Sequence, residues 1–315
     1  ELTVGNLTIK KNSRVVLTVN GNLTINGASE DLTEYGDLHV ANGGEVEVNG
    51  DLKVGDLTVE ASIGTDNGTA ESGQVENAEN IVYANAYIEI NMDPTGVMDD
   101  TKWYGFTVPF DVDAHAGISR KEGDTYRQCV YGTHYMIAEY DANKRLNTGK
   151  GWKYITGNTL YAGTFYYFTV NGNYNTYRFK AKEAAYTQAA PATLAMNGST
   201  SNPNANWNAV GNSTLQHAKV SFEGGNYVQV YQNGLDAYRT VSASEATFVV
   251  GCPFFIQATE ASTVVLDAPT SATESYYAPR RSSASQNGVA RVNLTSVEGG
   301  YSDRIYVSGT DKEEN

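Results

Sequence analysis

A short motif recurs at the start of the chain and constrains the fold more than any other feature. The motif is Gly, then Asn or Asp, then Leu, one variable residue, and Val or Ile. It begins at Gly5, Gly21, Gly36, Gly50 and Gly55, so its first four copies are 16, 15 and 14 residues apart. A turn followed by an alternating strand at a near-constant period is typical of a solenoid, in which each repeat forms one rung.

Each copy of the motif supplies a corner and a strand. Gly followed by Asn or Asp tolerates the positive backbone angles of a tight corner. Leu and the Val or Ile two positions later point to the same face of a strand, because side chains alternate along it. One rung cannot bury that face alone, so rungs must stack. Residues 1–92 are therefore predicted to form a short right-handed β-solenoid; a meander of hairpins with the same turn residues is the alternative.

Beyond residue 92 the rhythm changes and aromatic residues become frequent. Strand-like segments with alternating apolar and polar residues occur twice in the same order, which is typical of antiparallel sheets with one buried face. The first set begins at Trp103 and the second at Trp207. The other matched segments are 135–141 with 227–231, 152–155 with 238–241, 162–168 with 250–256, and 177–181 with 264–268. This order predicts either one antiparallel β-sandwich built by duplication or two small β modules side by side, and packed sandwich-like modules are favoured.

The whole chain is thus expected to be all-β and to have four parts. The solenoid covers 1–92, the first sandwich-like half 93–190 and the second half 191–270. Residues 271–315 are interpreted as a linker rich in Ser, Ala and Pro, followed by the start of a further β segment.

We expect a rigid joint between the solenoid and the first half. The alternating segments 81–83 and 86–90 are predicted to be the last rungs and to pack directly on the first half. Trp103, Tyr104 and Phe106 are the candidates for the contact. Burying such a side chain stabilises by roughly 1.5–3 kcal/mol, enough to fix the angle of the joint.

Charge and hydropathy exclude several kinds of partner. The chain has 36 acidic and 22 basic residues and a formal net charge of −14, which disfavours nucleic acid and anionic membrane surfaces. The most apolar run, 247–256, contains Gly251 and Pro253 and is shorter than the roughly 18 residues of a membrane span. We expect no nucleic-acid partner and no membrane insertion. The chain does not begin with Met, and we interpret it as a mature extracellular protein whose signal peptide has been removed.

The sequence contains no pattern typical of a catalytic centre. Its four histidines have no metal-ligand spacing, and neither a nucleophile elbow nor a phosphate-binding loop occurs. His39 occupies the outward position of its rung and is predicted to be solvated. We therefore expect a protein that is not an enzyme and has no cofactor, with calcium as the one candidate ion.

The calcium hypothesis rests on acidic residues near the predicted joint. Ca²⁺ takes six to eight oxygen ligands, often from loop carboxylates. A solvated polar loop is the alternative interpretation. The candidate ligands are Asp93, Asp99, Asp100, Asp111 and Asp113.

Tyrosine is frequent, with 22 residues, and suggests a sugar-binding surface. Exposed aromatic rings stack on the apolar face of a sugar. Tyr166, Tyr174 and Tyr177 are the candidate ligand-binding residues, and half-buried strand positions are the alternative. Cys129 and Cys252 occupy non-matching positions of the two halves, so free buried thiols are favoured over a disulfide.

Several segments of the duplicated part carry a family resemblance. They are Trp103 with 109–112, 138–141, 162–166, 207–212 and 253–257. Over roughly residues 100–310 the chain resembles large exported surface proteins of Bacteroides-type bacteria that are described as adhesins, except that Ser213 stands where related chains tend to have Pro. The resemblance implies adhesion or structural display at the cell surface, with a host or neighbouring-cell surface protein or glycan as partner. A carbohydrate-binding module of a surface glycan-handling system is the alternative.

Overall fold

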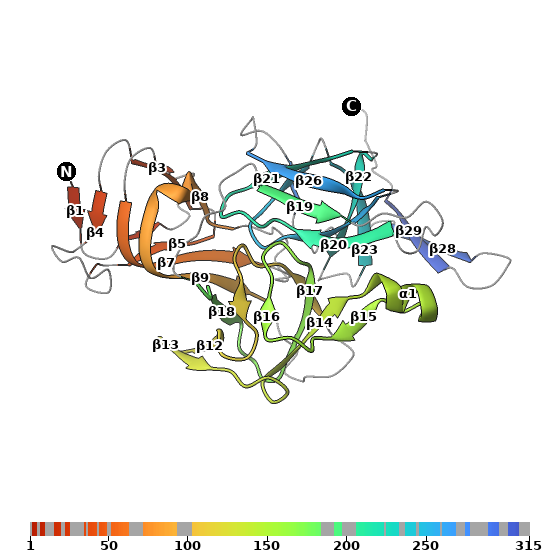
Figure 1. The fold of residues 1–315 in the computed structure, drawn as a ribbon, viewed down its shortest axis with the longest axis horizontal. Coiled ribbons are helices and arrows are strands. Elements are labelled where there is room, and N and C mark those ends of the chain that lie inside the picture. Colours follow the sequence, from red (N-terminus) through yellow and green to blue (C-terminus); the bar gives the residue numbers. More distant parts are fainter. Residues whose placement is uncertain are drawn as a thin grey trace, which may run out of the picture. The chain divides into compact units, whose positions relative to one another are not determined.

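The computed structural model of the protein is all-β (Figure 1). The chain forms two compact units, residues 1–281 and 282–315. The structure describes residues 2–4, 7–9, 16–19, 23–25, 35, 37–42, 44–48, 52–62, 72–92, 103–183, 192–196, 206–223, 225–232, 237–243, 246–258, 260–268, 275–277, 289–295 and 302–308.

The first part of unit 1–281 consists of parallel strands in two sheets. In the larger sheet these are β1 (Leu2–Val4), β2 (Leu7–Ile9), β4 (Leu23–Ile25), β5 (Leu38–Val40), β7 (Leu52–Ser62) and β9 (Ile81–Asn91). The smaller sheet contains β3 (Val16–Val19), β6 (Glu45–Val48) and β8 (Gln74–Glu76). A short 3-10 turn, η2 (Ala78–Asn80), precedes β9.

The leucines of the repeat are aligned across the larger sheet. Leu2 pairs with Leu23, Leu23 with Leu52, and Leu52 with Ile81. In the same way Leu38 lies between the equivalent leucines of β2 and β7. The pairing is parallel throughout, which contradicts a meander of hairpins. It is the stacking of equivalent positions that the repeat predicts.

Strand β9 also belongs to the antiparallel part of the chain. It pairs in parallel with β7 and antiparallel with β18 (Thr176–Lys180). The sheet then continues through β12 (Ile118–Glu122) to β13 (Thr125–Gln128). The prediction that the segment around 81–90 ends the parallel part and packs directly on the first half is confirmed, although this segment is one strand and not two.

Each half contains a second sheet, and the strand orders of the two halves agree. In the first half the order is β10 (Tyr104–Phe106), β17 (Tyr166–Val170), β14 (Tyr135–Tyr140) and β15 (Trp152–Tyr154). In the second half it is β20 (Trp207–Gly211), β25 (Pro253–Gln257), β22 (Tyr227–Gln232) and β23 (Ala237–Ser242). These are the segments that the sequence matches in pairs.

The other sheet of the second half repeats the arrangement around β9. Its order is β19 (Ala192–Met196), β26 (Ser262–Asp267), β21 (Ala218–Phe222), β24 (Ala246–Phe248) and β27 (Ser275–Tyr277). The run β19-β26-β21 corresponds to β9-β18-β12, so β9 takes the place in the first half that β19 takes in the second. The last parallel strand is therefore also a structural strand of the first sandwich-like half.

The remaining elements are short. The first half also contains β11 (Val112–Asp113), β16 (Thr159–Leu160) and the helix α1 (Ala142–Thr148). Unit 282–315 contains the antiparallel pair β28 (Val289–Thr295) and β29 (Ser302–Ser308). No helix in the described part of the chain is long and apolar enough to cross a membrane.

One hydrophobic core runs through the parallel part and the first half. It includes Leu52 and Ile88 from the parallel strands and Phe106 from β10. Phe106 contacts the rings of Tyr166, Phe168 and Phe179, which all belong to the first half, and Tyr104 lies in the same core. Trp103 instead contacts Tyr154 and Tyr167. Both cysteines are buried and free.

Candidate functional site

Two of the calcium candidates use their carboxylates to accept hydrogen bonds from backbone N–H groups. Oδ1 of Asp111 accepts from the N–H of Ala162 at 2.9 Å. Oδ1 of Asp113 accepts from the N–H groups of His115 and Ala116, each at 2.8 Å, and these bonds hold its pKa below the ordinary value. The three other candidates lie outside the described residues: Asp93, Asp99 and Asp100.

The three candidate tyrosines do not form an exposed surface. Tyr166 and Tyr177 are 1% and 0% exposed, and the hydroxyl of Tyr166 accepts from the N–H of Tyr161 at 2.9 Å. Tyr174 is half-buried, and the guanidinium of Arg120 lies 4.4 Å from the centre of its ring. The core and a cation thus occupy the ring faces that sugar stacking requires.

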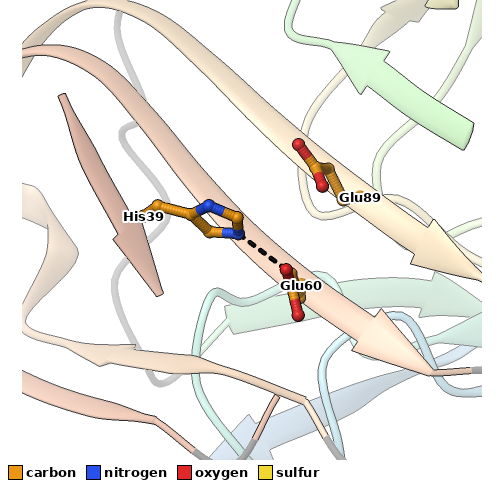
Figure 2. A group of neighbouring side chains, drawn as sticks. All are labelled: His39, Glu60 and Glu89. Atoms are coloured by element: carbon orange, nitrogen blue, oxygen red, sulfur yellow. Dashed lines mark ion pairs between the residues drawn. The ribbon is translucent and has the colours of Figure 1, made fainter. Parts of the chain in front are cut away.

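Three potential metal ligands instead come together on the polar face of the large sheet (Figure 2). They are His39 on β5, Glu60 on β7 and Glu89 on β9, and one ligand atom from each lies within 4.8 Å of the others. The pairing of the strands explains the arrangement. Glu60 is in register with Glu89, and His39 is in register with Thr58, two residues before Glu60.

His39 and Glu60 are close but poorly aligned. Nε2 of His39 lies 2.8 Å from Oε1 of Glu60. This nitrogen is nevertheless buried and has no hydrogen-bond partner among the described residues, because the approach is out of line for a hydrogen bond. Oε2 of Glu60 accepts from the N–H of Asn42 at 3.2 Å. Burial alone would raise the pKa of Glu60, but His39 and this backbone bond outweigh it and the pKa lies below its ordinary value.

Glu89 is a buried carboxylate held by two side chains of the first half. It is 1% exposed. Its Oε1 accepts from Nε of Arg178 at 2.9 Å, from Nη2 of the same guanidinium, and from the hydroxyl of Tyr126 at 2.6 Å. The guanidinium also lies 3.6 Å from the centre of the Tyr126 ring and 4.6 Å from that of Tyr87. These side chains bury an acidic residue on a strand position that faces away from the core.

The charges within this group do not cancel. Two carboxylates on neighbouring strands repel each other. With a neutral imidazole, the guanidinium of Arg178 offsets one of them. One negative charge then remains among these four side chains, and Lys121 nearby also acts on Glu60. One imidazole nitrogen and two carboxylate oxygens form a ligand set that suits Zn²⁺ and related ions. The arrangement can therefore bind a cation as well as tie together four strands.

Of this group, the sequence singles out only His39, and it predicts a solvated side chain there. His39 was expected to point outward, which it does, but it contacts Glu60 and is only partly exposed. The signal that could have found Glu60 is the repeat itself. Aligning the copies at Gly36 and Gly55 matches His39 with Thr58, and Glu60 follows on the same face.

Comparisons of the chain with models of protein families, with curated proteins and with solved structures gave no match.

Proposed function

We propose that this protein is a non-catalytic, exported component of a bacterial cell surface that serves adhesion or structural display. In this proposal the parallel strands up to residue 92 are turns of a short right-handed β-solenoid, which acts as a spacer. The two sandwich-like halves present the contact surface to a protein or glycan of a host or neighbouring cell. The proposal follows from the expectation, made from sequence motifs alone, that residues 100–310 resemble adhesins of Bacteroides-type bacteria.

The observation that carries the proposal is that hydrogen bonds join the three parts of unit 1–281 directly. Strand β9 is shared by the parallel part and the first half. The parallel part also bonds to the second half, because the N–H of Val75 donates to the carbonyl of Leu215 at 2.7 Å and the N–H of Val250 donates to Oγ of Ser72 at 3.0 Å. A body joined in this way keeps its internal angles under load, as a spacer must.

The two halves meet through aromatic side chains. Phe165, Tyr231 and Phe255 are buried together, with Trp152 and Tyr167 packed against them. Aromatic pairs of this kind add about 0.5–1.5 kcal/mol each beyond the burial of area. Backbone bonds reinforce the contact, since the N–H of residue 211 donates to the carbonyl of residue 163 at 2.8 Å. The display surface would thus be fixed relative to the spacer.

Two measurements test the proposal. Antibodies raised against the chain should label intact cells of the source organism, and protease treatment of those cells should remove the label. The purified protein should release no reducing ends from a broad panel of plant and animal glycans. Turnover of any glycan, or labelling only after the cells are lysed, would overturn the assignment.

An alternative function, carbohydrate binding, is favoured by a different set of aromatic residues from those predicted. Tyr154 and Tyr238 are 44% and 40% exposed at the border of the aromatic contact between the halves. The ring centres of Trp103 and Tyr154 are 6.0 Å apart. A glycan array tests this directly. Binding that is lost in Tyr154→Ala and Tyr238→Ala but kept in Tyr161→Ala, which removes another exposed ring, would support it; the absence of binding across the array would refute it.

A further inference from the structure

We propose that His39, Glu60 and Glu89 bind a divalent transition-metal ion, with Zn²⁺ as the best-suited ion. The site lies where the parallel part meets the first half, on three adjacent strands of one sheet. It is independent of the surface function proposed above. The metal would fasten the last parallel strands to each other at the joint.

The spacing of the ligand atoms suits such an ion. Zinc binds His nitrogen and carboxylate oxygen at about 2.0–2.2 Å, so tetrahedral ligand atoms lie about 3.4 Å apart. Here Nε2 of His39 and Oε1 of Glu60 are 2.8 Å apart, and the three ligand atoms all lie within 4.8 Å. Binding would require side-chain rotations that widen the 2.8 Å contact, with the strand pairing unchanged. The fourth position is then available to water or to a ligand.

The Nε2 atom of His39 is a second observation that points to a metal. It is buried and makes no hydrogen bond with the described residues, although a carboxylate oxygen of Glu60 lies 2.8 Å away. A buried polar atom without a hydrogen bond is costly. A metal ion between Nε2 and Oε1 of Glu60 would satisfy both without the alignment that a hydrogen bond requires.

The surroundings already supply the outer hydrogen bonds that metal-bound carboxylates need. Ligands of this kind are oriented by partners on their second oxygen atom. The N–H of Asn42 binds Oε2 of Glu60, which leaves Oε1 toward His39. Arg178 and Tyr126 both bind Oε1 of Glu89, so Oε2 is the atom that would take the metal.

Charge and ligand chemistry decide which ion fits. The group carries a residual negative charge, and the strand order β5-β7-β9-β18 places Arg178 at the end opposite to His39. The guanidinium thus neutralises Glu89 from outside the ligand set. Calcium and magnesium prefer oxygen ligands alone, whereas imidazole favours zinc, nickel, copper or iron.

The experiment uses the full chain after treatment with EDTA. Equilibrium dialysis against Zn²⁺, with the metal counted by mass spectrometry, should give one equivalent per chain. His39→Asn and Glu60→Gln, which keep polar side chains of similar size, should each weaken binding about tenfold or more. His115→Asn removes an exposed histidine elsewhere on the first half and should bind like the parent protein. Co²⁺ should give a visible absorption band that is lost in His39→Asn.

Two results would overturn the proposal. One is the absence of bound zinc at a free Zn²⁺ concentration of about 100 µM, which is well above the dissociation constants of protein zinc sites. The other is equal zinc affinity in the parent chain and His39→Asn. Circular dichroism spectra and melting temperatures in EDTA show whether each variant is folded. The paramagnetic shift of the His39 ring protons by Co²⁺ tests the same ligand in the parent protein and needs no substitution.

Discussion

Replacing Arg178 by Met should destabilise the protein by about 3–5 kcal/mol, because it leaves a carboxylate buried without its counter-ion. Glu89 is 1% exposed and receives two of its hydrogen bonds from this guanidinium. In Arg178→Met only the bond from Tyr126 remains. The Met side chain retains much of the packing of the Arg stem, so the change reports mainly on charge. Loss of the cation–π contact with Tyr126, 3.6 Å from the ring centre, adds about 0.5–1 kcal/mol.

Urea unfolding in EDTA, followed by tryptophan fluorescence and circular dichroism, measures this loss. The control is Arg127→Met, which breaks the solvent-screened ion pair of Arg127 with Glu122 and should cost far less. Removing the second charge as well, in Arg178→Met with Glu89→Leu, should recover most of the stability, because a buried apolar pair replaces a buried ion pair at little cost. If Arg178→Met costs no more than the control, the reasoning about Glu89 is wrong.

Three further predictions concern other parts of the fold. Burial lowers the pKa of His217 from 6.5 to about 4, so the unfolded chain takes up a proton that the folded chain does not. The stability that His217 contributes is therefore complete above pH 6.5 and falls by about 3 kcal/mol as the pH drops to 4. In urea unfolding of His217→Gln across this range, the free energy of unfolding should depend less on pH than in the parent protein. An unchanged pH dependence would contradict the lowered pKa of His217. Gly163→Ala should lower stability by roughly 1–3 kcal/mol more than Gly123→Ala in the same assay. Both glycines have positive φ, but only at Gly163 would an added Cβ meet another side chain, at 2.7 Å from Leu194. Equal losses of stability would show that this close contact is unimportant. A protease site inserted within residues 93–102 and then cleaved should leave both pieces in one gel-filtration peak, because β9 and β18 remain hydrogen-bonded; two separate peaks would disprove the rigid joint.

The parallel strands could be predicted because the repeat encodes both corner and strand. The last two copies, starting at Gly50 and Gly55, are instead parts of one strand, β7. Five residues leave no room for a separate turn between two strands, so β7 continues through both copies and pairs with β4 along its first part and with β5 along its second. Val54 and Leu57 are three residues apart and both buried, so the alternation shifts between the two copies. Gly55 keeps its place in mid-strand because a Cβ there would lie 2.4 Å from the carbonyl oxygen of Tyr35.

The burial of the tyrosines could not be predicted from one strand. Because side chains alternate along a strand, Tyr166 and Tyr167 must face opposite sides of the sheet. The alternation does not tell which face of the sheet is covered by other elements. In the structure Tyr166 enters the core of the first half, and Tyr167 packs against the second half. Both faces of β17 are covered because two halves lie against each other, and that contact depends on residues far apart in the sequence.

The cluster of His39, Glu60 and Glu89 with Arg178 could not be predicted from the sequence for a similar reason. His39 and Glu60 are related by the repeat, so their proximity follows once the parallel strands are paired in register. The partner of Glu89, however, is Arg178, which lies 89 residues further along the chain and is aligned by antiparallel pairing. The repeat contains no information about that pairing.

The position of the polar group at the joint explains how β9 can serve two kinds of sheet. A parallel stack ends in a strand with unpaired backbone groups, which invites further pairing. Here β18 covers that strand, and the register must be correct because a slip by one residue would turn Glu89 into the core and Ile88 and Ile90 out of it. The contacts of Glu89 with Arg178 on β18 and Tyr126 on β13 form only in the observed register. The buried carboxylate thus specifies how the two parts of the sheet join, with or without a bound metal.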